Sequence, residues 1–356
     1  MSLHGLAVAS QDARVTQMLA RIAGLAGDDA IVAASRDLRE LAFELLEAAE
    51  SAPQLTRTIA DLNDALTIRI LETARAVHLP DGVRFAWLAL GSEGRQEQTV
   101  LTDQDNALIF EAGDARELRP RLLAFADGVN RLLDRCGFPL CHGDVMARNP
   151  SWCLTGDEWR ERFAGWIDTG DPQALLHGAI FFDFRGLWGQ LDLAADLRRW
   201  LSAYIEPRPL FLRQMTQNAL RARPPLDWLG RLRFERRAHA AASFDIKLQG
   251  VGLFTDAARI LALARGVPAT GTAARLLGWA RNADEQRQAE SWVEAFHALQ
   301  MFRLRRQRDC HRQCEPLDNR IPGDSLSGFD RRILHACFEE ATSLRRRIAV
   351  DYALAL

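Results

Sequence analysis

The spacing of apolar residues is the feature that most limits what this chain can fold into. Over most of its length, apolar residues recur three or four positions apart, as at Leu38, Leu41 and Leu45. This spacing places them on one face of a helix. It predicts helices through residues 1–80 and again through residues 156–356. Short apolar runs of strand type interrupt the pattern only between these regions. The sequence therefore predicts a mostly helical α+β protein with one small sheet.

The strand-type patterns are confined to the middle of the chain. Short apolar runs predict a buried strand over residues 85–90, a second strand over residues 106–110, and a third strand-like segment over residues 140–147. Between the second and third, residues 116–136 have the apolar face of an amphipathic helix. The helix-breaking residues Pro80-Asp81-Gly82 directly precede this strand-containing region.

Three regions follow from this order. We predict an N-terminal helical region of residues 1–80, an α/β module of residues 81–155, and a helical bundle of residues 156–356. The predicted helices of the last region include residues 174–189 and residues 238–247, separated by loops rich in proline and glycine.

Composition narrows the classes of partner. The 45 Lys and Arg residues and the 47 Asp and Glu residues give a net charge of 45 − 47 = −2. The net charge therefore gives no reason to expect nucleic-acid binding. The start of the chain does not resemble a signal peptide, and no apolar run reaches the ~18 residues of a membrane span. The six cysteines are scattered, and Cys310, His311 and Cys314 lack a second pair at zinc-site spacing. We expect a cytoplasmic protein without a membrane partner.

A Gly-Ser pair directly follows the first predicted strand. Gly91 lets the chain turn sharply and come close to a ligand, and Ser92 adds a hydroxyl donor. A helix that begins at Ser92 points its free N–H groups at the turn, which favours a phosphate there. Arg95 adds a cation with forked donors suited to phosphate oxygens. We therefore predict nucleotide-phosphate contacts from Gly91, Ser92 and Arg95.

Two aspartates, Asp103 and Asp105, precede the second predicted strand. On a strand, residues two apart project from the same face. Two carboxylates held close repel each other unless a cation lies between them. Mg²⁺ is typically held by one or two carboxylates together with substrate phosphates, and Mn²⁺ takes similar oxygen ligands. The pair therefore predicts a Mg²⁺ (or Mn²⁺) site for phosphoryl or nucleotidyl transfer.

Each half of this constellation also has a structural interpretation. A Gly-Ser pair is common in turns, and Thr-Asp-x-Asp can form an Asx-turn or a helix cap. A purely structural helical scaffold, however, leaves the combination of the two halves unexplained. With strands on both sides and about ten residues between the halves, a ligand site is the favoured interpretation.

The string from Gly91 to Asp105 resembles the metal and phosphate motif of the DNA polymerase β-like nucleotidyltransferase superfamily. Extended to Asn106, it is similar to the signal-transduction nucleotidyltransferases often attached to CBS domains, which are related to PII uridylyltransferases and glutamine synthetase adenylyltransferases. Further similar blocks follow in order at residues 141–152, 181–185 and 245–253. No CBS domain precedes the module, and no His-Asp pair of the phosphohydrolase type occurs, so no uridylyl-removing activity is implied.

The resemblance implies a polymerase β-like sheet and an enzyme of the uridylyl- or adenylyl-transfer type. Such an enzyme moves a nucleoside monophosphate from an NTP, such as ATP, to a hydroxyl acceptor, with a signalling protein as one acceptor class. Lys247 is then a cation that contacts the nucleotide phosphates. The third carboxylate of such sites is Asp144, with Asp183 as the competitor. The alternative function is a regulatory module that senses NTP and Mg²⁺ without turnover.

Overall fold

The computed structural model describes residues 13–48, 51–79, 82–170, 172–236, 241–352 and 354. The chain divides into two compact units. The first comprises Met1–Ala49, Gln54–Trp166 and Ile180–Leu201. The second comprises Glu50–Pro53, Ile167–Ala179 and Ser202–Leu356. Among the described residues, no helix is long and apolar enough to cross a membrane.

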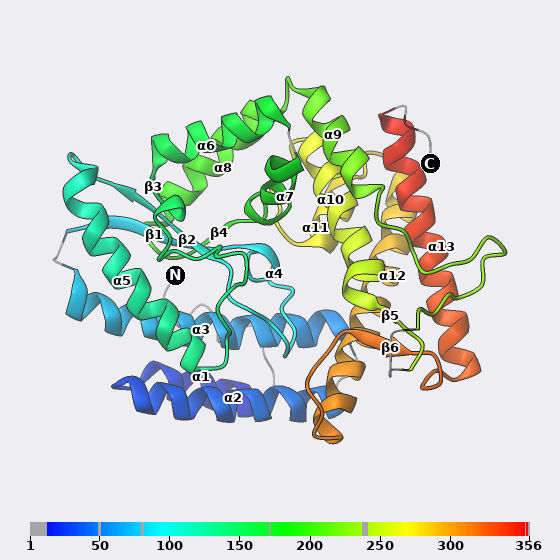
Figure 1. Cartoon of the computed structure of the whole chain (residues 1–356), viewed down its shortest axis with the longest axis horizontal. Helices are drawn as coiled ribbons and strands as arrows, with labels where there is room; N and C mark the ends of the chain where they lie inside the picture. Colours follow the sequence, from blue (N-terminus) through cyan, green and yellow to red (C-terminus); the bar gives the residue numbers. More distant parts are fainter. Residues whose placement is uncertain are drawn as a thin grey trace. The chain divides into compact units, whose positions relative to one another are not determined.

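The first unit begins with the helices that the apolar spacing predicts. These are α1 (Ala13–Ala23), α2 (Asp28–Ala48) and α3 (Ala52–His78), drawn in blue in Figure 1. Their apolar faces are buried in one core cluster together with the sheet. The predicted α+β class is therefore confirmed, as are the N-terminal helices from Ala13 onward; residues 1–12 of that prediction lie outside the described residues.

A four-stranded sheet forms the centre of the first unit. Its strands are β1 (Arg84–Ala89), β2 (Asn106–Glu111), β3 (Cys153–Thr155) and β4 (Arg185–Gly189), in the order β3-β2-β1-β4. β1 pairs antiparallel with both β2 and β4, and β3 pairs parallel with β2. The first two strands match the apolar runs in the sequence.

Different elements cover the two faces of the sheet. Alternate residues of β1, beginning with Phe85, join the core cluster with α3 and α5 (Ala115–Arg135). Side chains of the intervening residues are also buried. An aromatic cluster that includes Trp159 of α6 (Gly156–Thr169) packs on the sheet, and Trp159 Nε1 donates to the Leu108 carbonyl at 2.9 Å. Burial on both sides fixes the strand ends that carry the predicted motif.

Two elements of this unit differ from the sequence prediction. Residues 140–147 do not form a strand; Leu140 makes only an isolated bridge with Gln104, and β3 takes the third position. The predicted helix over residues 174–189 is correct up to Phe181 and wrong beyond it. Helix α7 (Pro172–Phe181) ends early, and β4 follows it. Strand pairing with β1 satisfies the backbone of this apolar segment, which periodicity alone could not distinguish from a helix.

The second unit is mainly helical, as predicted. Its helices are α9 (Pro209–Ala219), α10 (Gly252–Ala264), α11 (Thr272–Trp279), α12 (Ala283–Arg312) and α13 (Gly328–Asp351). α8 (Leu191–Ile205) begins in the first unit, and its residues from Ser202 onward belong to the second.

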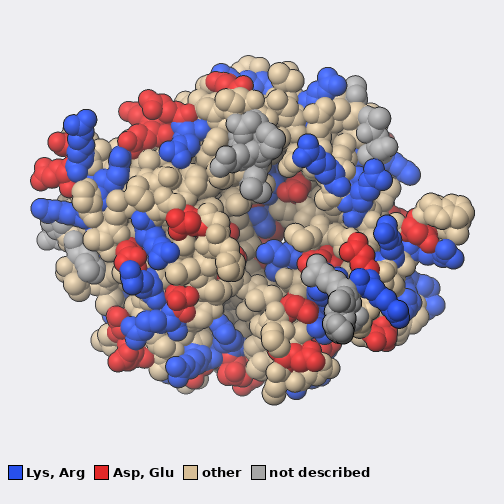
Figure 2. All heavy atoms as spheres, in the orientation of Figure 1, with Lys and Arg blue, Asp and Glu red and all other residues tan. Residues whose placement is uncertain are grey.

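A small two-stranded antiparallel sheet pairs β5 (Ser243–Asp245) with β6 (Arg320–Pro322). The predicted helix over residues 238–247 is therefore wrong where it overlaps β5, and residues 238–240 of it lie outside the described residues. Arginines and acidic side chains alternate over the surface drawn in Figure 2, in keeping with the near-neutral net charge.

Candidate functional site

The Gly-Ser turn lies at the end of β1, directly against Asp105. Leu90 donates its backbone N–H to the Asp105 carbonyl at 3.0 Å. Gly91 has a φ of +50°, and a Cβ added there would lie 3.1 Å from Asp105 Oδ2. A side chain at position 91 would therefore be strained by the positive φ and would crowd the Asp105 carboxylate. The helix that follows, α4 (Gly91–Gly94), has only four residues, so its dipole is far smaller than that of a long helix.

The two predicted metal ligands approach each other closely. Ligand atoms of Asp103, Asp105 and Cys141 all lie within 4.8 Å of one another. Asp103 is exposed, whereas Asp105 and Cys141 are half-buried. The paired carboxylates suit a hard divalent cation such as Mg²⁺ or Mn²⁺, and the glycine beside them leaves room for it.

Cys141 was not among the residues that the sequence singled out. Burial, together with the nearby Asp105 carboxylate, raises the pKa of the Cys141 thiol to about 11. The thiol therefore stays protonated at neutral pH and can donate to a carboxylate oxygen. A single cysteine in a loop gives no signal of this role in the sequence, because only the fold brings it to the aspartates.

Arg95 is held by two carboxylates. Its Nε donates to Glu97 Oε2 at 2.8 Å, and its Nη1 donates to Asp183 Oδ2 at 2.6 Å. Asp183 is fully buried. The chain passes so close that a Cβ at Gly94 would lie 2.0 Å from the Asp183 carbonyl oxygen. Glu97 and Asp183 thus brace Arg95, and a phosphate would have to share or replace these partners.

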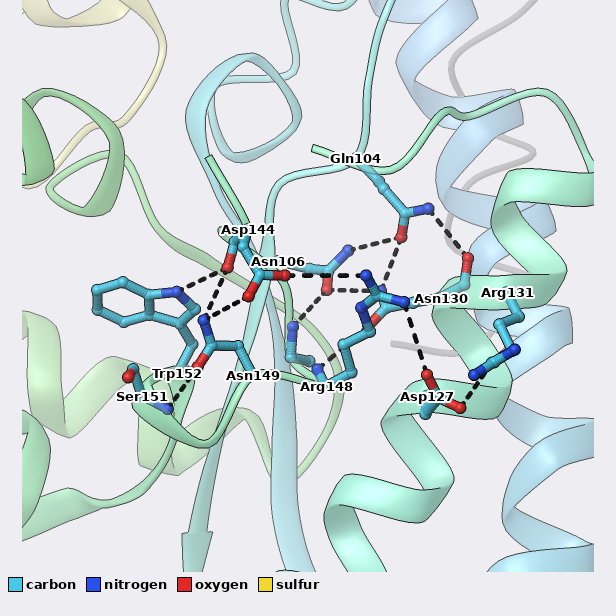
Figure 3. Close-up of polar contacts among 11 residues, drawn as sticks. Gln104, Asn106, Asp127, Asn130, Arg131, Asp144, Arg148, Asn149, Ser151 and Trp152 are labelled. Carbon is cyan, nitrogen blue, oxygen red and sulfur yellow. Dashed lines mark hydrogen bonds and ion pairs between the residues drawn. The ribbon is translucent and has the colours of Figure 1, made fainter. Parts of the chain in front are cut away.

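Asp144 occupies an exposed turn of the loop that follows Cys141 (Figure 3). It has a φ of +51°, a value uncommon for a residue other than glycine. Its Oδ2 accepts from Asn149 Nδ2 at 2.9 Å, and its carbonyl accepts from Trp152 Nε1 at 3.0 Å. Asp144 does not belong to the group formed by the two aspartates and Cys141. These contacts give it a clear part in shaping the loop.

Buried acidic residues behind the turn are a second feature that sequence analysis missed. Glu93 of α4 is 7% exposed. Burial raises its pKa to about 8, with the negative charges of Asp64 and Asp105 adding to the rise. Arg185 bridges this region, because its Nη2 contacts both Asp64 oxygens at 2.9 Å and the Glu93 carbonyl at 3.2 Å. Asp64 lies on α3, so an N-terminal helix supports the turn.

Lys247 lies in the second unit, at the start of a short π-helix, η3 (Lys247–Val251). The residue is exposed. Asp245 and Gln249 fix the turn: the Leu248 N–H donates to Asp245 Oδ1 at 3.0 Å, and the Asp245 N–H donates to Gln249 Oε1 at 3.0 Å. Short π-helical segments occur frequently at functional sites.

Two family descriptions match the chain. Residues 36–173 match the family described as "Putative nucleotidyltransferase DUF294". Residues 209–352 match the family described as "Putative nucleotidyltransferase substrate binding domain". The chain belongs to this nucleotidyltransferase family. No curated protein matches the chain.

The family match agrees with the geometry of the site. The turn at Gly91, the aspartate pair and Cys141 all lie in the segment matched to the nucleotidyltransferase. Lys247 lies in the segment matched to the substrate-binding domain. A nucleotide substrate follows from the family.

Proposed function

We propose that this protein is a Mg²⁺-dependent nucleotidyltransferase that moves a nucleoside monophosphate from an NTP to a hydroxyl group, with release of pyrophosphate. One observation carries the proposal: the turn at Gly91 lies against the Asp105 carboxylate, which lies close to that of Asp103. A triphosphate needs both close access to backbone and a metal-binding pair. The family description supports the same reaction class.

The residues of the turn have distinct roles in this proposal. Asp103 and Asp105 hold Mg²⁺ or Mn²⁺, which neutralises charge on the phosphates and on the leaving oxygens. Gly91 lets the phosphates approach the backbone, and the Ser92 hydroxyl donates to a phosphate oxygen. Arg95 acts on the phosphates or, through its buried ion pairs, on the shape of the turn.

A base must accept the proton of the acceptor hydroxyl. Asp144 remains our proposal from the sequence for this role or for completing the metal site, with Asp183 as the competitor. Asp183 is buried and paired with Arg95, whereas Asp144 is exposed. Exposure favours Asp144, since a base must reach the acceptor.

Lys247 is the only lysine among the 45 lysine and arginine residues of the chain. If the two cations were interchangeable here, arginine would be expected at this position as at all the others. A lysine carries a compact, strongly hydrated point charge, unlike the planar fork of arginine. We propose that Lys247 contacts the nucleotide phosphates and that its ammonium group is specifically required.

The acceptor is proposed from resemblance alone. The similarity to PII uridylyltransferases and glutamine synthetase adenylyltransferases suggests a protein hydroxyl and a role in signal transduction. A second function, NTP sensing without turnover, is favoured by one observation: the third ligand atom beside the aspartate pair is the Cys141 thiol and not a carboxylate.

The two functions are separated by following the α-phosphate. The protein is incubated with each NTP labelled at that position, with Mg²⁺ and cell lysate. Covalent transfer of label that is lost in the Asp103→Asn/Asp105→Asn variant supports the enzyme. Metal-dependent binding without transfer supports the sensing module. Absence of metal-dependent NTP binding contradicts both.

The uniqueness of Lys247 gives a second test. The 2′,3′-dialdehyde derivative of an NTP reacts with amines near its binding site. Among side chains, we expect it to modify Lys247 alone, and we expect the unmodified NTP with Mg²⁺ to protect it. Labelling of Lys247 that is insensitive to NTP contradicts its proposed role.

A further inference from the structure

Three buried amide side chains form a network around the segment that carries the aspartate pair. Gln104 and Asn106 alternate in sequence with Asp103 and Asp105, and Asn130 comes from α5 (Figure 3). All three amides are at most 2% exposed. Asn130 Nδ2 donates to Gln104 Oε1 at 2.7 Å and to Asn106 Oδ1 at 2.9 Å. We call these three residues the amide network.

The amide network also holds the chain on both sides of Cys141. The backbone N–H groups of Ala147 and Arg148 donate to its amide oxygens at 2.8 Å and 3.2 Å. On the other side, its Gln104 amide donates to the carbonyl of Phe138 at 3.0 Å. One set of hydrogen bonds therefore connects two segments that are distant in sequence, each carrying a ligand atom of the candidate metal site.

Asn130 is the centre of the amide network, because it uses both of its side-chain donors and its acceptor. Some buried polar side-chain atoms in the described part of the chain have no hydrogen-bond partner, but none of them belongs to these three amides. Burial of amides is unfavourable unless they are hydrogen-bonded. A well-packed apolar cluster in their place would stabilise the fold equally well. What the amide network adds is a fixed geometry for the segments that it joins.

We propose that Asn130 is a positioning residue, which sets the distance between the Asp103–Asp105 segment and the loop that carries Cys141. The inference rests on the proposed function, since it assigns a role in metal binding. Asn130 does not touch the ligand. It acts through Gln104 and Asn106, whose backbone is continuous with Asp105. Removal of its amide frees both segments and widens the spread of carboxylate positions.

The test compares variants that lower stability by different means. Asn130→Ala deletes the central amide, and Leu133→Ala removes a buried apolar side chain from the same helix. Mn²⁺ alone is the probe, and its uptake by the full chain is followed by electron paramagnetic resonance. Urea unfolding of each variant reports stability separately. Gln104→Met, which has nearly the same shape without the amide, replaces Asn130→Ala if that variant does not fold.

We expect Asn130→Ala to weaken Mn²⁺ binding about 10-fold or more, as found for outer-shell residues of metal sites. We expect Leu133→Ala to bind Mn²⁺ like the wild type despite its lower stability. Equal Mn²⁺ affinity of Asn130→Ala and wild type would overturn the positioning role alone. Equal weakening in both variants would also overturn it, by showing a general effect of stability. Failure of the wild type to bind Mn²⁺ would overturn the proposed metal site and this role with it.

Discussion

Glu93 offers a test of the buried electrostatics behind the Gly-Ser turn. In the folded protein, burial and the charges of Asp64 and Asp105 raise its pKa from 4.5 to about 8. Between these two pH values the folded state keeps a proton that the unfolded state releases. The wild type therefore loses stability as pH rises through this window. Glu93→Gln keeps the shape of the neutral acid and cannot ionise, so it removes this loss.

The size of the effect follows from the two pKa values. One pKa unit corresponds to about 1.4 kcal/mol, so a rise from 4.5 to about 8 corresponds to roughly 5 kcal/mol. This is an upper bound, because residual structure in the unfolded chain reduces the difference. We expect the free energy of unfolding of Glu93→Gln, minus that of the wild type, to increase steadily from pH 5 to about pH 8.

Urea unfolding at a series of pH values measures this difference, with a chelator present so that no cation lies beside Asp105. Titrating groups that do not interact with Glu93 behave alike in both proteins and cancel in the subtraction. Glu97→Gln is a matched control, because it removes an ion pair with Arg95 instead of a buried acid with a raised pKa. It should lower stability throughout the range. Parallel curves for Glu93→Gln and wild type would refute the raised pKa and the burial argument behind it.

The remaining predictions concern the ligands. The double substitution Asp103→Asn/Asp105→Asn should abolish the increase in NTP affinity that Mg²⁺ provides. An unchanged increase, measured by calorimetry on the folded variant, would contradict the proposed metal site. Lys247→Arg should weaken triphosphate binding about 10-fold and nucleoside binding little, since contacts to charged groups contribute ~1.5–3 kcal/mol; equal affinity would show that the single lysine has no special role. Cys141→Ser should weaken Cd²⁺ binding far more than Mn²⁺ binding, since thiolate prefers the softer metal; equal changes would place the thiol outside the site.

Local patterns predicted much of the fold. The 3–4 spacing gave α1 to α3, and the short apolar runs gave β1 and β2. β4 was missed because an apolar run next to a helix has no period of its own, and its strand conformation depends on hydrogen bonds to β1. β3 was misplaced for a similar reason: it is three residues long and exists through its pairing with β2.

The candidate site divides in the same way. By itself, the sequence determined the Gly91 turn and the proximity of Asp103 and Asp105, because residues so close along the chain cannot separate far. Only the tertiary structure decided which distant groups join them. It brought Cys141 to the aspartates and the amide of Asn130 beneath their segment. Contacts between residues far apart in sequence depend on how helices and strands pack, and no local pattern records that packing.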